Sequence, residues 1–416
     1  MTIHSVIYEW QRKYLPQHTL TVRQRSFRPL SKPQLRRLFY SCLTLLVLYY
    51  LVWQIPSRYR KYVQQQDRWV DYPFSSPRKV QVFMPIGIQR AYKNEDFCRS
   101  LWSAVVNGYR VTLYNWNVDA EDEFDTHKPK VTSLSSILSS SRLLQSLGIF
   151  PQDLVLLVDA IDVILQLSPS VLISRYSLIP KGQQGKPITA GSFNCYPNEA
   201  NSSACLDIPS SPMPIDLFYS DRDILRDSQS RLPIHANSGL VVGSVPEMRS
   251  LFGKLNDTLT GGEYPYQPDQ VSQAGVFNIH LSKGDLKVDN TLSMFWCAEH
   301  LTNSLTLLSS TDTGIAGNMI SPCDKFQYPF TISPSDLPIS RLLAKDKRTS
   351  NIPVALHFNG IGAEPGYKEI WEKMWPSIGS EEYRTIWGEE KVRIVVDDKV
   401  EKKSVRDLCG SQLGYI

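Results

Sequence analysis

The chain has 416 residues, enough for one large domain or two ordinary ones, and 42% of them are hydrophobic. Charged residues make up 21%, as in ordinary globular proteins. The formal net charge of +4 is small for this length, so the composition does not indicate a nucleic-acid-binding protein.

An apolar run without charged residues extends from Leu38 to Trp53, and Pro56 ends it. Its length is close to the lower limit of the ~17–25 residues that a helix needs to cross a bilayer. Arginines precede the run, and aromatic residues near its end suit a membrane interface, so we predict a transmembrane anchor over residues 38–56. A buried core helix is the alternative.

The basic residues also predict the orientation of this anchor. Those that precede it favour a cytoplasmic tail at residues 1–37, which places the rest of the chain on the lumenal side. A short span suits the thinner membranes of the early secretory pathway. We therefore expect a type II protein of the Golgi or ER membrane, with a stem over residues 57–79.

After the stem, the sequence alternates between strand and helix signals. Strands at 80–87 and 110–115 flank a helix that includes 97–105, and an amphipathic helix at 131–147 leads into an apolar strand that begins at Leu154. This β-α-β-α-β order predicts a doubly wound parallel sheet with right-handed crossovers. The predicted fold class is therefore α/β.

Beyond this strand the pattern is less regular. Residues 181–235 are rich in Pro, Ser and Asn, and we expect them to form loops over a substrate cleft. Strands at 238–243 and 353–360, with a helix at about 247–255 between them, restore the regular pattern. The predicted divisions of the lumenal part are a main domain at 80–390 and a C-terminal tail at 391–416.

The cysteines and two sequence motifs agree with a lumenal location. Two Asn-x-Ser/Thr sequons begin at Asn201 and Asn256, which predicts a glycoprotein. Cys195 and Cys205 flank a polar loop and form the disulfide that we expect first. An even set of cysteines, able to form disulfides in an oxidising compartment, follows the predicted anchor. Its members are Cys98, Cys195, Cys205, Cys297, Cys323 and Cys409.

Two aspartates follow the most apolar strand of the sequence. The run from Leu154 to Val158 has no polar alternation, as in a central strand covered on both faces, and Asp159 and Asp162 come directly after it. Ligands of open α/β sheets bind outside the carboxyl ends of such strands. The two side chains converge only if the chain turns after Asp159, and converged carboxylates favour a divalent cation such as Mg²⁺ or Mn²⁺. A helix N-cap beside a solvated acid is the alternative.

Four short segments occur in an order that resembles a known family. They are Val158-Asp-Ala-Ile-Asp162, Ala236-Asn-Ser-Gly239, Asp269-Gln270 and His357-Phe-Asn-Gly360. With Lys130 at the start of a helix, they resemble the glycosyltransferase domain of the lysyl hydroxylase and procollagen glucosyltransferase family. The resemblance covers about residues 80–375, and it implies a Rossmann-like nucleotide-sugar transferase fold of the GT-A type. The chain departs from the family at Phe358, where the family has a smaller residue, and in the loop at 196–235.

The resemblance implies a role for each matching residue. The ligands of a divalent cation, usually Mn²⁺, would be Asp159, Asp162 and His357. Lys130 would face the diphosphate of a bound UDP-sugar. The remaining matches are Asn237, Ser238 and Gly239 at the junction of donor and acceptor, Gly360 beside the donor, and Asp269 with Gln270 on the acceptor side. Among them, Asn237 and Asp269 are the catalytic candidates, with Asp269 as a base or positioning group.

The chemistry of these residue types supports the same function. A metal ion and a lysine neutralise the charge of a departing diphosphate without any proton transfer. An imidazole with two carboxylates suits Mn²⁺ better than Mg²⁺, which prefers oxygen ligands. We therefore expect a hexosyltransferase that moves a sugar from a UDP-sugar to a protein or glycan acceptor in the secretory lumen.

Several alternatives remain open at the level of sequence. The chain would have the same fold if it were a non-catalytic lumenal glycan-binding or scaffold protein, or a transferase of another family. His357 would then be a core histidine bonded to backbone. Lys128 is an alternative to Lys130, and Trp296 would belong to the core or stack on a sugar ring.

Overall fold

The computed structural model describes most of the chain after residue 78. The described residues are 79–118, 123–179, 185–214, 232–261, 273–298, 304–308, 343–359, 363–374, 377, 387–410 and 412. Within these ranges, no helix is both long enough and apolar enough to cross a bilayer. The predicted anchor and stem lie outside the described residues, as do Asp269, Gln270 and Gly360.

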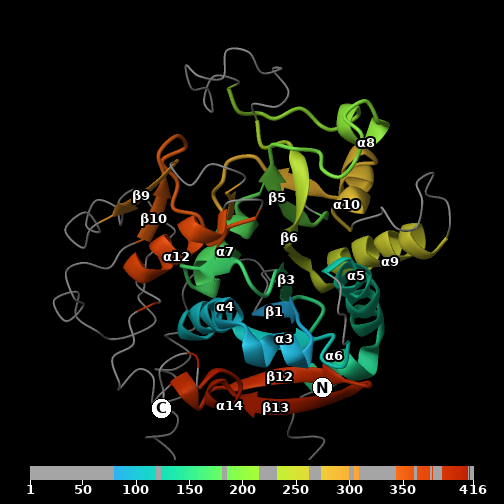
Figure 1. The fold of residues 1–416 in the computed structure, drawn as a ribbon. Coiled ribbons are helices and arrows are strands. Elements are labelled where there is room, and N and C mark those ends of the chain that lie inside the picture. The colour runs from blue at the N-terminus through green and yellow to red at the C-terminus, as the bar shows by residue number, and fades with distance from the viewer. Residues whose placement is uncertain are drawn as a thin grey trace, which may run out of the picture. The chain divides into compact units, whose positions relative to one another are not determined.

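A mixed eight-stranded sheet forms the centre of the fold (Figure 1). The four strands β12, β2, β1 and β3 are parallel, β6 is antiparallel to β3, and β5 and β7 are parallel to each other. The α/β class is thus as predicted, but the sheet is not wholly parallel. In sheet order the strands are β13 (Lys399–Ser404), β12 (Lys391–Val396), β2 (Arg110–Tyr114), β1 (Val80–Pro85), β3 (Leu154–Val158), β6 (His235–Ser244), β5 (Ile188–Ser192) and β7 (Lys287–Asp289).

Two smaller sheets accompany the main one. The three-stranded sheet has the order β4 (Val163–Leu165), β11 (Ala355–His357) and β8 (Phe295–Cys297). The two-stranded sheet pairs β9 (Leu305–Leu308) with β10 (Leu343–Asp346). All five strands have three or four residues, and only β11 lies within a predicted strand, at 353–360, because such short strands give a weak periodic signal in the sequence.

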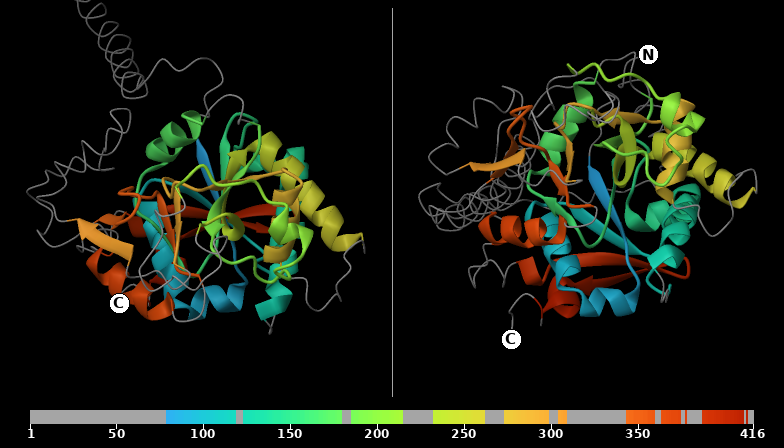
Figure 2. Two further views of the ribbon diagram at one scale, coloured as in Figure 1. Left: turned by 90° about the horizontal axis from the view of Figure 1, so that it is seen from above. Right: turned by 45° about the horizontal axis from the view of Figure 1, so that its top comes forward.

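Helices cover both faces of the main sheet, and Figure 2 gives two further views of this layering. On one face lie α3 (Ile88–Lys93), α4 (Glu95–Val106), α7 (Pro169–Ser177), α12 (Ala363–Lys373) and α14 (Val405–Cys409). On the other face lie α5 (Glu123–Ser139), α6 (Ser141–Leu147), α9 (Val245–Thr260) and α10 (Gln273–Ser282). The short helix α8 (Ser203–Leu206) packs beside α10.

The unbroken apolar sequence of β3 reflects its position between two hydrophobic cores. Leu154, Leu156 and Val158 belong to the core under α4 and α7, whereas Val155 and Leu157 belong to the core under α5, α9 and α10. All five residues are fully buried. Because side chains alternate along a strand, only a strand covered on both faces requires apolar residues at every position.

The helix predicted at 131–147 is two helices. Ser140 interrupts it, because its side-chain oxygen accepts a hydrogen bond from the Leu143 backbone N–H at 3.3 Å and so caps α6. Gly148 ends α6 in the left-handed conformation, with φ of 64°, which a glycine adopts without steric cost.

The stretch assigned to a C-terminal tail is part of the main sheet. Strand β12 pairs in parallel with β2, and β13 forms the sheet edge beside it. A disulfide between Cys98 in α4 and Cys409 in α14 joins this stretch to the first helices of the domain. The predicted boundary at residue 390 therefore lies inside one continuous sheet.

The disulfide predicted between Cys195 and Cys205 is confirmed. The fifth cysteine of the described residues, Cys297, is a buried thiol. Two disulfides are typical of a protein that matures in an oxidising compartment.

We expect the loss of the Cys98–Cys409 disulfide to lower the free energy of unfolding by about 2–5 kcal/mol, because the bridge closes a very long loop of the unfolded chain. Cys98→Ala and Cys409→Ala should each lower the melting temperature in a thermal unfolding experiment. The double variant should be no less stable than the worse single variant, since both remove one bond. Additive losses would contradict this assignment.

Candidate functional site

The chain leaves the main sheet at Asp159 and enters the three-stranded sheet at Val163. Strand β3 ends at Val158, so Asp159 is the first residue beyond its carboxyl end. The turn that follows brings Asp162 to the start of β4. This is the change of direction that convergence of the two carboxylates requires.

His357 reaches the same place from a distant part of the sequence. It is the last residue of β11, which pairs antiparallel with β4 so that His357 lies opposite Val163. The Phe358 N–H donates to the Asp162 carbonyl at 2.9 Å, which extends this pairing to the aspartate itself. The imidazole is almost fully buried, with 2% of its surface exposed.

Strand β6 packs against both Asp159 and His357 through Gly239. The Asp159 N–H donates to the Gly239 carbonyl at 2.8 Å, so the two backbones lie in direct contact. A Cβ atom at position 239 would overlap the His357 ring and lie 2.7 Å from Asp159 Oδ2. Only glycine therefore fits between the aspartate and the histidine.

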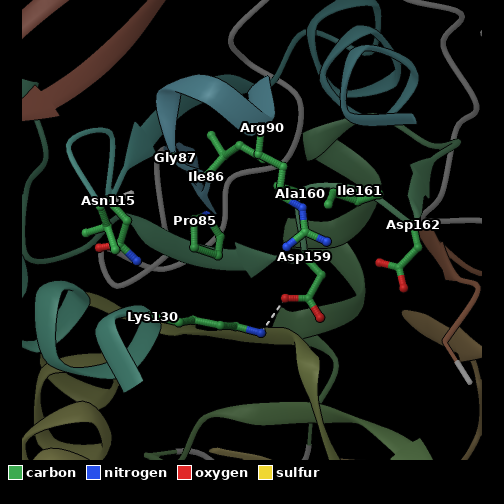
Figure 3. A pocket seen from close by; sticks show the side chains of 11 residues that line it. Pro85, Ile86, Gly87, Arg90, Asn115, Lys130, Asp159, Ala160, Ile161 and Asp162 are labelled. Atoms are coloured by element: carbon green, nitrogen blue, oxygen red, sulfur yellow. Dashed lines mark hydrogen bonds and ion pairs between the residues drawn. The ribbon is translucent and has the colours of Figure 1, made fainter. Parts of the chain in front are cut away.

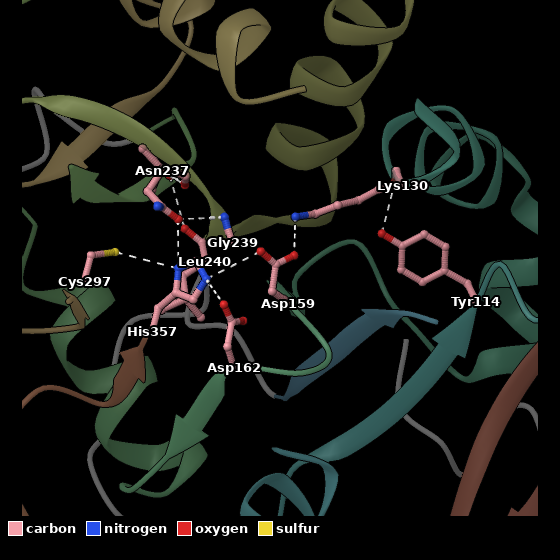
Figure 4. Close-up of polar contacts among 10 residues, drawn as sticks. Tyr114, Lys130, Asp159, Asp162, Asn237, Gly239, Leu240, Cys297 and His357 are labelled. Atoms are coloured by element: carbon pink, nitrogen blue, oxygen red, sulfur yellow. Dashed lines mark hydrogen bonds and ion pairs between the residues drawn. The ribbon is translucent and has the colours of Figure 1, made fainter. Parts of the chain in front are cut away.

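These three side chains form a compact group of potential metal ligands (Figure 4). His357 Nε2 lies 3.3 Å from Asp162 Oδ2 and 3.6 Å from Asp159 Oδ2. Neighbouring ligand atoms around one small divalent cation are roughly 3 Å apart, given metal–ligand distances near 2.1 Å. One nitrogen and two carboxylate oxygens thus have the spacing and the chemistry for a cation of the Mn²⁺ type.

Lys130 supplies a positive charge to the group. Its amine contacts Asp159 Oδ1, and its side chain is only 3% exposed. Lys130 lies in the interior of α5 and not at its start as predicted, and Tyr114 fixes this part of the helix because its hydroxyl donates to the Lys130 carbonyl at 3.1 Å. Lys128 is exposed, so the structure places Lys130, and not Lys128, in the site.

The charges of Asp162 and His357 depend on each other. Burial is the largest single influence on the pKa of His357 and lowers it, but the charge and hydrogen bond of Asp162, together with Cys297, outweigh burial and hold this pKa well above its ordinary value. Desolvation raises the pKa of Asp162, and the charge of His357 brings it below the ordinary value. Without a cation, a proton on the imidazole therefore neutralises part of the carboxylate charge. A cation and this proton would compete for the same nitrogen atom.

An open pocket lies next to the group, at the carboxyl ends of β1, β2 and β3 (Figure 3). Lys130, Asp159 and Asp162 line it together with Arg90 from α3 and Asn115, which directly follows β2. The sequence reasoning missed Arg90 and Asn115. Their position just after parallel strands was the available signal, because the carboxyl ends of such strands share one edge of the sheet.

Gly87 and Asn115, which both line this pocket, have unusual backbone surroundings. A Cβ atom at Gly87 would lie 2.5 Å from the Val118 carbonyl oxygen, so the loop after β1 can approach only at a glycine. Asn115 has a left-handed backbone with φ of 64°, and its Oδ1 is buried without a hydrogen-bond partner among the described residues. Backbone strain and an unpaired polar atom together are typical of a functional site.

The structure distinguishes among the other predicted residues. Asn237 reaches the cluster, because its Oδ1 lies 3.0 Å from His357 Nδ1. Ser238 is buried next to it, and no contact within the described ranges joins Ser238 to the three potential ligands. Trp296 belongs to the core: it is fully buried and packs edge-on against Phe358.

Compared by sequence, the chain matches no protein-family model and no curated protein. Compared by structure, it is similar to the galactosyltransferase LgtC in complex with donor and acceptor sugar analogues, with 13% identity and a TM-score of 0.34 over 73% of this chain and 99% of that chain. An active-site mutant of LgtC gives the same values. The apo structure of the bifunctional glycosyltransferase WbbM has 10% identity and a TM-score of 0.34, over 74% of this chain and 51% of that chain.

We expect Gly239→Ala to abolish divalent cation binding, because the added methyl group would push His357 and Asp159 apart. Gly243→Ala on the same strand is the matched control. Its Cβ would meet the flexible Met248 side chain at 3.2 Å and the Pro187 Cα at 3.3 Å, so it would need a small local shift but would contact none of the three potential ligands. Titration with Mn²⁺, followed by the electron paramagnetic resonance signal of the free ion, measures the binding. Equal Mn²⁺ affinity in both variants would contradict the tight packing at Gly239.

Proposed function

We propose that this chain is a metal-dependent glycosyltransferase that moves a hexose from a UDP-sugar to a protein or glycan acceptor. The observation that carries the proposal is the convergence of Asp159, Asp162 and His357 beside Lys130, at the pocket where three parallel strands end. The order of segments that resembles procollagen glucosyltransferases supports it, since three of the four segments meet at this one place. The fourth contains Asp269, whose role on the acceptor side remains a proposal from the resemblance.

The mixture of charges at the pocket supports a phosphate-containing substrate. Acidic side chains alone would bind a cation, and basic side chains alone would bind an anion. Here Asp159 and Asp162 share the pocket with Arg90 and Lys130, so it suits a cation and a diphosphate together. A cation held by Asp159, Asp162 and His357 would neutralise the charge of the departing diphosphate.

The residues of the chain then have separate tasks in the proposed reaction. Lys130 is held in place by Asp159 and provides a fixed positive charge, which needs no reorganisation as negative charge develops. Arg90 is exposed at the pocket and is free to pair with a phosphate in a bidentate manner. Gly87 and Asn115 line the end of the pocket beyond these charges, where they would contact the nucleoside part of the donor.

A screen of UDP-sugars with the purified full-length protein tests the function. We expect release of UDP that requires Mn²⁺ and depends on one donor sugar.

His357→Ala removes a neutral ligand, so its activity should fall steeply at low Mn²⁺ and recover in part at high Mn²⁺. Asp162→Ala removes a charged ligand and should not recover.

His280 and Asp285 offer matched controls for these substitutions. They form a second, partly buried pair, with Nδ1 and Oδ2 separated by 2.7 Å, and they lie outside the cluster. His280→Ala and Asp285→Ala should keep the wild-type dependence on Mn²⁺. A protein that binds UDP but releases none from any UDP-sugar would instead be a non-catalytic binding protein.

We also propose that the domain lies in the lumen of the Golgi or ER, behind the predicted anchor at 38–56. The two disulfides support this compartment. The two sequons differ in their surroundings. Asn201 is exposed, in the loop that the Cys195–Cys205 disulfide closes, whereas Asn256 lies within helix α9 and is partly buried.

We expect one N-glycan at Asn201 when the full-length protein is expressed in a eukaryotic secretory pathway. Endoglycosidase treatment should lower the apparent mass of the wild type, and Asn201→Gln should remove most of that change. Asn256→Gln is the comparison, and it should have a small effect because the Thr258 hydroxyl of its sequon is bonded within the helix, to the Lys254 carbonyl at 3.0 Å. A protein without glycan at either position would contradict the lumenal location.

A further inference from the structure

The orientation of the Asn237 amide follows from a single backbone contact. The Gly239 N–H donates to the Asn237 side chain at 2.8 Å. A backbone N–H is only a donor, so the side-chain atom that it meets is the carbonyl oxygen Oδ1 and not the NH₂ group. The strand holds this arrangement in place, because the Thr189 hydroxyl on β5 donates to the Asn237 backbone carbonyl.

The same oxygen determines which nitrogen of His357 carries hydrogen. Asn237 Oδ1 lies 3.0 Å from His357 Nδ1. An amide oxygen has two lone pairs, so it accepts from the Gly239 N–H and from the imidazole at once. An unprotonated Nδ1 would place two acceptors against each other, which leaves Nδ1–H as the favourable form of the neutral ring.

The opposite side of the ring favours the other tautomer. Nε2 faces Asp162 Oδ2 at 3.3 Å and Asp159 Oδ2 at 3.6 Å, and both carboxylates attract an N–H at that position. A ring with its hydrogen on Nε2 would have no lone pair to offer a cation there. Asn237 is therefore the group that opposes the two carboxylates and leaves the Nε2 lone pair directed at them.

We propose that Asn237 is a positioning residue that makes His357 Nε2 a metal ligand by fixing the tautomer and orientation of the ring. This inference rests on the proposed function, since it takes the three-residue group to be a cation site. It differs from a direct catalytic role for Asn237, because the amide acts through His357. Cys297 Sγ, at 3.8 Å from the same Nδ1, is too weak a hydrogen-bond partner to replace the amide oxygen.

Mn²⁺ binding to the full-length protein without nucleotide tests the proposal, because it requires no catalytic turnover. Loss of a residue that orients a metal-binding histidine typically weakens metal binding about 10–100-fold. We expect a loss of this size for Asn237→Ala. Asn237→Asp keeps an oxygen acceptor of the same size, so its Mn²⁺ affinity should stay within about threefold of the wild type or increase, since a carboxylate makes the imidazole a better ligand.

Asn278 provides the matched control for a purely structural effect. It is also a buried asparagine, and its Oδ1 accepts the Ala236 N–H of the same strand at 2.8 Å. Asn278→Ala should lower the melting temperature and leave the Mn²⁺ affinity unchanged. Equal losses of Mn²⁺ affinity in Asn237→Ala and Asn278→Ala would overturn the proposal, as would an unchanged affinity in Asn237→Ala.

A measurement on the unaltered protein identifies the metal-bound nitrogen directly. With histidines labelled with ¹⁵N and Zn²⁺ as a diamagnetic probe, His357 should show hydrogen on Nδ1 and the metal on Nε2. Its signal is assigned by its absence from His357→Gln. Coordination through Nδ1 would overturn the role of Asn237 and leave the transferase proposal intact. A wild-type protein that binds neither Mn²⁺ nor Zn²⁺ would overturn both.

Discussion

The repulsion between Asp159 and Asp162 is the constraint on which the site depends. With His357, their ligand atoms lie within 4.8 Å of one another, where two negative charges repel by about 3–4 kcal/mol at an effective dielectric constant of ~20. Lys130 offsets part of this repulsion from one side, and a protonated His357 offsets part of it from the other. A bound divalent cation would replace that proton and neutralise both acids. The group is thus arranged so that occupancy by a cation relieves the electrostatic strain of the folded chain.

The two sheets hold the acids together against this repulsion. Asp159 ends a strand of the large sheet, whereas Asp162 and His357 belong to neighbouring strands of the small one. The four-residue turn from Asp159 to Asp162 links the two sheets directly, and the hydrogen bond from the Asp159 N–H to the Gly239 carbonyl joins the turn to β6. Because both sheets are packed into the same hydrophobic core, the carboxylates cannot separate without disturbing that core.

The sequence carried strong signals for the long, regular elements and for the acids that follow them. β1, β2 and β3 were predicted to within two or three residues, since each is a short run of mostly apolar and β-branched residues, unbroken in β3. Of the small sheet, only β11 lies in a predicted strand, at 353–360. The antiparallel direction of β6 and the strands β4 and β8 were not predicted, because direction and three-residue pairing depend on distant contacts. The choice of Lys130 over Lys128 depends on which face of α5 meets Asp159, and the contact of Asn237 with His357 joins residues 120 positions apart. Neither the choice of Lys130 nor the contact between Asn237 and His357 follows from the local sequence pattern. The role of His357 is indicated by the family resemblance and not by periodicity.

The position of β12 next to β2 has a consequence for synthesis of the protein on the ribosome. The strand β2 lies near the start of the main sheet in sequence, and among the described residues its edge away from β1 pairs with residues 393 and 394, about 280 positions later. Until those residues emerge, the nascent domain presents an apolar strand with unpaired backbone groups, a surface that readily joins other unpaired strands. Completion of the sheet and closure of the disulfide to Cys409 both wait until these distant residues have been made, since the two cysteines are 311 positions apart. The edge of β2 is therefore the surface of the early chain that most needs protection from association with other chains.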